Sequence, residues 1–111
     1  MTIRYKSDTF DLTTTNITTV LTCPADATIL VKSLQASHES SGAVDVDAYL
    51  KKSGGSDVEI SHAELNKNFT NMISDTLAME ASDELKVKAE TADEITGVVS
   101  YALIDRSQEN G

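Results

Sequence analysis

Strict alternation of apolar and polar residues predicts a β-strand over residues 44–51, "VDVDAYLK". Successive side chains of a strand point to opposite sides, so one face would hold every apolar position: Val44, Val46, Ala48 and Leu50. "KKSGGSD" then predicts a turn, and "VEIS" resumes with Val58 and Ile60 on the same buried face. The pattern indicates an antiparallel hairpin with one buried and one solvated face.

The same alternation recurs along the chain. "ELKVKAE" at 84–90 places its apolar residues inward, whereas 28–36 and 97–104 are more continuously apolar, as in central strands covered on both faces. Weaker strand candidates are "IRYKS", "TFDLT", "ITTVLT" and "TLAME", and turn signals fall at 24–26, 40–42, 54–55, 81–83 and 91–93. About eight short strands at this spacing suggest a sandwich or a small barrel. We expect residues 1–111 to form a single antiparallel β-sandwich, with either jelly-roll or immunoglobulin-like strand order.

The best helix candidate is residues 61–74, "SHAELNKNFTNMIS", where Ser61 and Glu64 have the spacing of a capping box. Its apolar residues fit a helical face only loosely. We therefore interpret the segment as strand, loop and strand.

Composition narrows the function. The chain has 18 acidic and 9 basic residues, giving a net charge of −9, and the acidic residues form no long run. This balance opposes binding to nucleic acid, which needs concentrated Lys and Arg, and binding to an anionic membrane. A single cysteine, Cys23, allows no internal disulfide, and no apolar run is long enough to span a membrane. We expect synthesis in a cytoplasm and no secretion signal.

Several residues invite a chemical interpretation. His38 with Glu39, and His62 with Glu64, resemble metal ligands, but a closed site needs three or four converging groups. We expect both histidines on the surface or in loops. Asp45 and Asp47 share a strand face and suggest calcium binding or an acid–base pair, yet exposed charges that protect a sheet edge explain them better. Cys23 is expected to be a small buried hydrophobic residue.

Nucleophile elbows, phosphate-binding glycine loops and basic–aromatic patches are absent from the sequence. We expect no enzymatic activity, no cofactor and no metal.

Three segments, in order, resemble small β-sandwich virion structural proteins of tailed bacteriophages of marine and cyanobacterial type. They are "TTNITTVLTCPADATILVKSLQASHESSGAVDVDAYL", "LAMEASDELKVKAE" and "ITGVVSYALID", which together cover about residues 13–105. Two positions depart from the pattern: Cys23 stands where valine is usual, and Ser82 stands where glycine is usual, which suggests a different turn type there.

The resemblance implies a capsid decoration protein that binds the head lattice, or a neck, tail or fibre accessory. It implies residence in the virion, homo-oligomerisation, and contact with the major capsid protein or other virion proteins. Residues 1–12 would be an N-terminal contact arm. The candidate contact residues are Ile3, Tyr5, Phe10, His38, Glu39, Lys51, Lys52, Phe69 and Met72.

Two other functions stay open. A carbohydrate-binding module would use a β-sandwich, but the chain has no Trp and its three tyrosines are scattered. A small enzyme or metalloprotein would use His38, His62 and the acidic residues.

Overall fold

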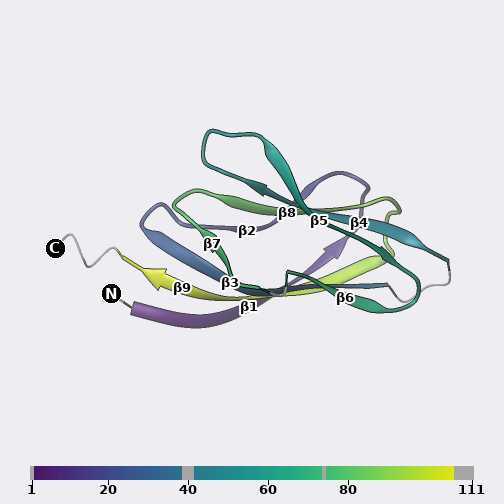
Figure 1. Ribbon diagram of the computed structural model, residues 1–111, viewed down its shortest axis with the longest axis horizontal. Helices are drawn as coiled ribbons and strands as arrows, with labels where there is room; N and C mark the ends of the chain where they lie inside the picture. The colour runs from purple at the N-terminus through teal and green to yellow at the C-terminus, as the bar shows by residue number, and fades with distance from the viewer. Residues whose placement is uncertain (1, 39–41, 74, 107–111) are drawn as a thin grey trace.

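The computed structural model describes residues 2–38, 42–73 and 75–106, which form nine β-strands and no helix (Figure 1). The strands are β1 (Thr2–Leu12), β2 (Thr18–Thr22), β3 (Ala27–His38), β4 (Val44–Lys51), β5 (Asp57–Leu65), β6 (Phe69–Ile73), β7 (Leu77–Met79), β8 (Glu84–Ala89) and β9 (Ile95–Asp105). The prediction of an all-β chain is confirmed. The segment 61–74 is strand, loop and strand over its described residues, so the helix is correctly rejected.

The strands form two antiparallel sheets that face each other as a sandwich. One sheet has the order β1-β9-β3-β6, with β7 also paired to β3, and the other has the order β2-β8-β4-β5. The pairs are nested along the chain: β1 with β9, β2 with β8, β3 with β6 and β7, and β4 with β5. The molecule is elongated, with extents of 53 × 26 × 22 Å.

The core lies between the sheets and consists mainly of small and branched aliphatic side chains. Alternation assigns the inward residues of two strands correctly, because Val44, Val46 and Ala48 of β4, and Leu85, Val87 and Ala89 of β8, are buried. Cys23 is also buried, as predicted, and its thiol donates to the Ala27 carbonyl oxygen at 3.3 Å. Burial raises the pKa of this thiol, with a further contribution from the nearby Asp83 carboxylate.

Two predictions of burial are wrong. Val58 is 58% exposed and Ile60 is also exposed, although alternation placed both inside. The β4–β5 register shifts at this point: Ala48 is opposite Ser61, but Tyr49 is opposite Glu59, so Ile60 is an extra residue in a β-bulge. Beyond the bulge, the β4–β5 hairpin rises away from the opposite sheet (Figure 1), which agrees with the exposure of Val58.

The continuously apolar segments do form central strands, β3 and β9, but only their inner faces are buried. Along β3, residues such as Leu30, Ser33 and Gln35 on the other face are half-exposed. Coverage on both faces is therefore wrong for these strands, because no layer lies outside this sheet in the described chain.

Asp45 and Asp47 are not edge charges either. Their strand, β4, lies between β8 and β5, whereas β1 and β5 are edge strands of their sheets. The two segments "IRYKS" and "TFDLT" belong to one continuous edge strand, β1, which pairs with β9 along its full length.

Candidate functional site

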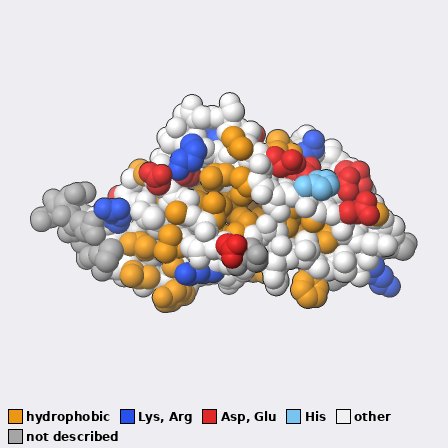
Figure 2. Space-filling view, viewed as in Figure 1, with side chains coloured by type: hydrophobic (Ala, Val, Ile, Leu, Met, Phe, Trp, Pro, Cys, Tyr) orange, Lys and Arg blue, Asp and Glu red, His pale blue; other side chains and the backbone are white. Residues whose placement is uncertain are grey.

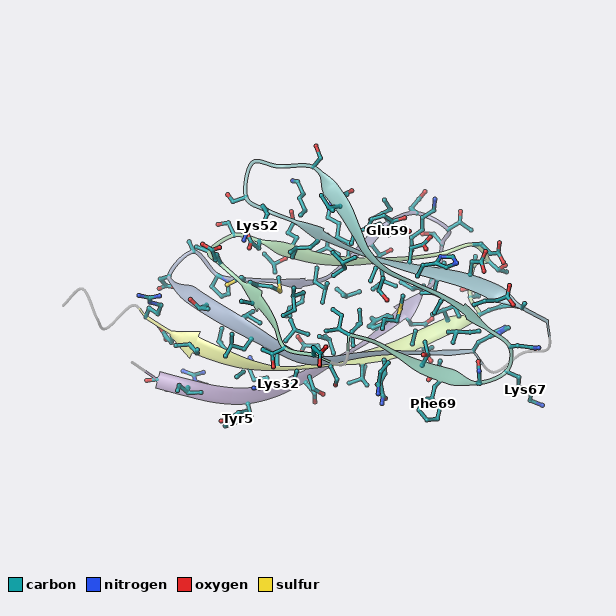
Figure 3. The ribbon with its side chains drawn as sticks, in the orientation of Figure 1. Tyr5, Lys32, Lys52, Glu59, Lys67 and Phe69 are labelled. Carbon is teal, nitrogen blue, oxygen red and sulfur yellow. The ribbon has the colours of Figure 1, made fainter. Side chains whose placement is uncertain are left out.

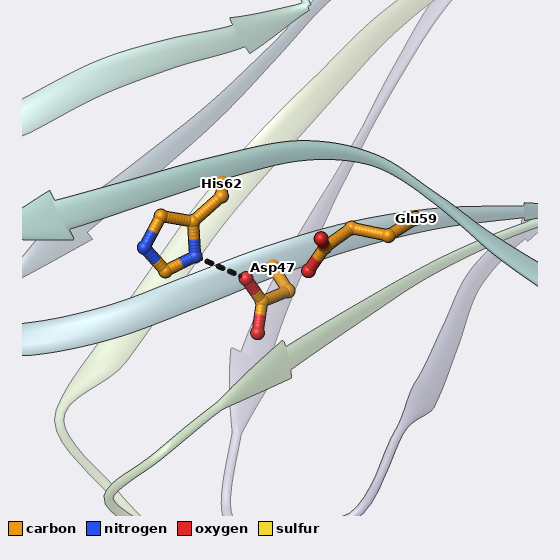
Figure 4. Close-up of side chains that lie close together, drawn as sticks. All are labelled: Asp47, Glu59 and His62. Atoms are coloured by element: carbon orange, nitrogen blue, oxygen red, sulfur yellow. Dashed lines mark hydrogen bonds and ion pairs between the residues drawn. The ribbon is translucent and has the colours of Figure 1, made fainter.

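Three side chains that can bind a metal converge on the outer face of the β4–β5 hairpin: Asp47, Glu59 and His62 (Figure 4). Their candidate ligand atoms all lie within 4.8 Å of one another. Asp47 and His62 are direct cross-strand partners, and the His62 Nδ1 contacts an Asp47 carboxylate oxygen. Figure 2 shows acidic side chains gathered beside a histidine on this part of the surface.

The β-bulge is what completes this cluster. In a regular strand, residues 59 and 62 are separated by an odd number of positions and point to opposite faces. Because Ile60 is inserted without a partner, Glu59 lies opposite Tyr49 and on the same face as His62. The sequence suggested His62 with Glu64, and Asp47 with Asp45, but no pattern in the sequence indicated Glu59.

Proton binding at the cluster reflects the crowding of its charges. A hydrogen bond with Asp47 raises the pKa of His62, because the carboxylate favours the imidazolium. A hydrogen bond with Asp47 and the nearby Asp47 charge also raise the pKa of Glu59, because both favour its protonated form. The cluster therefore favours bound cations and protons.

His38 is not a surface residue, so the expectation that it lies on the surface or in a loop is wrong. It is 2% exposed at the end of β3, where its Nδ1 lies 3.2 Å from the Leu65 carbonyl oxygen and its Nε2 lies 3.2 Å from Glu94 Oε2. Both ring nitrogens thus join β3 to the end of β5 and to the segment before β9. Glu39 lies outside the described residues.

Lys51 and Lys52 form ion pairs within the chain. Lys51 lies 3.5 Å from Glu84, and Lys52 contacts both Glu80 and the buried carboxylate of Asp83. Asp83 also accepts hydrogen bonds from the backbone N–H groups of Ser53 and Glu80, at 3.1 and 2.9 Å. These lysines hold the base of the β4–β5 turn against the turn before β8.

The remaining candidate contact residues divide into two groups. Met72 is buried in the core, and Phe10 is half-buried against the core. Ile3, Tyr5 and Phe69 are exposed, by 51, 81 and 65%. Tyr5 and Phe69, together with Lys32, point away from the sandwich on the outer side of the β1-β9-β3-β6 sheet (Figure 3).

The outward residues of this sheet form an apolar surface at the β1 side. The strand register places Tyr5 of β1 next to Ala102 of β9, and Ala102 next to Leu30 of β3. Ile3 and Ile104 form the neighbouring pair. We call these five residues the outer patch; hydrophobic side chains are visible along this side of the molecule in Figure 2.

No described segment is a helix that could cross a membrane. No family model matches the sequence, and no curated protein matches it.

Solved structures nevertheless share the fold. A chain of the acidic stable capsid of Helicobacter pylori bacteriophage KHP30 superposes with a TM-score of 0.60 at 10% identity, over 96% of this chain and 90% of that one. A chain of the Bacillus endospore appendages, which form disulfide-linked pili, superposes with a TM-score of 0.53 at 11% identity, over 95% of this chain and 88% of that one. At these identities the likeness shows a common fold, which in both cases spans nearly the whole chain.

Proposed function

We propose that this chain is a bacteriophage virion structural protein, and that it decorates the capsid by binding to the head lattice. The observation that carries the proposal is the nested pairing of the strands, in which the first strand pairs with the last. It gives one sheet the order β1-β9-β3-β6 and the other sheet the order β2-β8-β4-β5. This order supports a jelly roll, an architecture common among viral capsid domains. Its likeness to a chain of the KHP30 capsid supports the same assignment.

The sequence resemblance to small virion proteins of tailed phages adds independent support. The segments that carry it correspond to β2 through β4, β7 with β8, and β9. The resemblance therefore lies in strands that build the sandwich, and its pattern implies no catalytic residues. We propose accordingly that the protein acts as a structural component and not as an enzyme.

The outer patch and the exposed Phe69 supply a surface for lattice binding. Exposed aromatic and aliphatic side chains on one face are typical of protein contact sites. Many weak identical contacts on a symmetric shell would add up to stable attachment, particularly if the protein is a homo-oligomer. The free edge of β1 offers backbone groups for an added strand from a neighbour, which would make residues 1–12 a contact arm.

Assembly into a pilus would be the other function suggested by a shared fold. One observation argues against the disulfide-linked kind: Cys23 is 1% exposed, and no second cysteine is present. An intermolecular disulfide needs an accessible thiol. Carbohydrate binding also has little support, since Tyr5 is the one tyrosine that is largely exposed in the described chain.

The decisive experiment is to measure copy number in purified virions by quantitative mass spectrometry, relative to the major shell subunit. A simple fraction of the shell count supports lattice decoration. A count of one or a few rings supports a neck or tail location instead, and absence from particles contradicts any virion role.

The binding surface is tested by adding purified protein to particles that lack it. Tyr5→Ser combined with Phe69→Ser should abolish binding while leaving the fold intact, because both side chains are exposed. Val58→Ser is the matched control, since Val58 is an exposed apolar residue on the other sheet. Equal binding by all three proteins would exclude the proposed surface.

A further inference from the structure

We propose that Asp47, Glu59 and His62 form a binding site for a divalent transition-metal cation, with Zn²⁺ as the matching ion. The site is independent of the proposed function. One imidazole and two carboxylates are a donor set that zinc accepts, and three protein ligands leave a coordination position open to water or to another group.

The backbone fixes the three ligands before any ion binds. All three side chains extend from β4 and β5, whose pairing holds Asp47 directly opposite His62. Their ligand atoms already lie within 4.8 Å of one another, a separation compatible with bonds of about 2 Å from each atom to one central zinc ion. Binding would thus need small side-chain rotations and no change of the backbone.

The charge balance favours a cation at this position. Two carboxylates face one histidine, and no lysine or arginine among the described residues forms an ion pair with Asp47 or Glu59. The nearest basic residues in register are Lys88, opposite Asp47, and Lys86, opposite Tyr49. Lys86 is paired with Asp57 at 3.0 Å.

Other titratable groups around the cluster add to its negative field. Asp45 on β4 and Glu64 on β5 are cross-strand partners one step along the same face from the Asp47–His62 pair. Lys88 on β8 opposes them in part. A metal ion binds carboxylates and imidazole in their deprotonated forms, so protons compete with it for these ligands. We therefore expect the affinity to fall as the pH decreases from 7.5 to 5.5.

The bulge supports a specific arrangement over a chance gathering of surface charges. It costs one unpaired residue, Ile60, and its effect is to turn Glu59 toward the Asp47–His62 pair. Bulges recur where a strand must redirect a side chain at a site. A regular hairpin of the same sequence would leave Asp47 and His62 as a simple ion pair.

The test is isothermal titration of the intact protein with ZnCl₂ at pH 7.5, with CaCl₂ as the comparison. We expect one Zn²⁺ per chain, weaker binding of Ca²⁺ because it prefers oxygen ligands, and a higher melting temperature with zinc. Zinc should also shift the NMR signals of the His62 ring.

Substitution of each proposed ligand tests which side chains bind the zinc ion. Asp47→Asn, Glu59→Gln and His62→Gln should each weaken zinc binding by about tenfold or more. Glu64→Gln is the matched control, since Glu64 is acidic, on the same strand and outside the cluster; it removes one nearby charge but no ligand, so it should weaken zinc binding by much less than tenfold. Because the three ligands are on the surface, the variants should keep the parent's circular dichroism spectrum.

Three results would overturn the proposal. They are no binding at millimolar zinc, unchanged affinity in both Glu59→Gln and His62→Gln, and tighter binding of calcium than of zinc. The last would show that the imidazole contributes nothing.

Discussion

The aromatic ring of Phe10, on edge strand β1, lies over Gly97 on the neighbouring strand β9. A Cβ atom at Gly97 would lie 2.3 Å from Phe10 Cζ and 2.2 Å from the carbonyl oxygen of Gln35. Gly97 is on β9, between β1 and β3, and is opposite Phe10 in the register. The absent side chain therefore lets β1 and β3 both approach closely, and the N-terminal strand is anchored to its own domain at this point.

Gly97→Ala should consequently destabilise the fold by about 1–3 kcal/mol, the usual cost of overpacking, because the Gln35 backbone cannot move aside as a flexible side chain would. Chemical denaturation followed by circular dichroism measures the change. Ser100→Ala on the same strand is the control and should change stability by less than about 0.5 kcal/mol. If the two variants unfold alike, the close contact is not a constraint on the fold.

Asp83 should be essential for joining the β4–β5 turn to the turn before β8. It is 1% exposed and accepts hydrogen bonds from two backbone N–H groups and Lys52. Asp83→Ala leaves those donors unpaired and should lower the free energy of unfolding by about 2–3 kcal/mol. Lys52→Met keeps both backbone hydrogen bonds to Asp83 and should have a smaller effect. Equal losses in the two variants would mean that the ion pair alone matters.

Asp83 should also make the stability of the fold depend on pH in the acidic range. Burial alone would raise the pKa of Asp83, but hydrogen bonds from Lys52, Glu80 and Ser53 outweigh it and lower the pKa below its ordinary value of 3.8. A lowered pKa in the folded state contributes stability above the unfolded pKa and loses it as the pH falls through the folded one. The free energy of unfolding, measured between pH 5 and pH 2, should therefore decrease in the parent, and it should decrease less in Asp83→Ala.

Ser82 adopts the left-handed conformation, with a φ of 67°, in the turn before β8, at the position where the sequence pattern led us to expect glycine. The expectation of a different turn type is thus unnecessary, because Ser82 takes a backbone conformation suited to glycine. Ser82→Gly should raise stability by up to about 1 kcal/mol by removing this strain. Ala81 is in the same turn but does not have a positive φ, so Ala81→Gly should lower the stability. A destabilised Ser82→Gly would show that the Ser82 side chain compensates for its backbone.

Strands and their inward faces could be predicted from the sequence because they depend on local alternation. Val46 and Val87 are buried for the reason given by the pattern: each is an apolar residue between two polar ones in a regular strand. The strand order could not be predicted, since it depends on pairings such as Ser7 with Ser100 that lie far apart in the chain. Alternation carries no information on which strand lies beside which.

The candidate sites were harder to predict for related reasons. Glu59 joins His62 only because of one inserted residue, and a bulge has no reliable sequence signature. His38 looks like a polar loop residue in sequence, but Leu65 and Glu94 satisfy both its ring nitrogens and allow it to be buried. Exposure of Tyr5 follows from the absence of a covering layer, which no local pattern shows.

Tyr101 should ionise far above the normal range of tyrosine. Burial, together with a hydrogen bond of 2.9 Å from its hydroxyl to Asp8, raises the pKa of Tyr101 to about 12 from the ordinary value of 10.0. A raised pKa in the folded state gives stability that is complete below the unfolded pKa and is lost as the pH rises through the folded one. The parent should therefore lose stability between pH 10 and 12, and Tyr101→Phe should lose less. Absorbance at 295 nm should show a tyrosinate component with a pKa of about 12, and this late component should be missing in Tyr101→Phe. Asp8→Asn is the second variant, because it removes the carboxylate charge but keeps an acceptor, and it should move the late component toward the ordinary pKa. A late component that persists in Tyr101→Phe would assign the raised pKa to another tyrosine and exclude the Tyr101–Asp8 hydrogen bond as its cause.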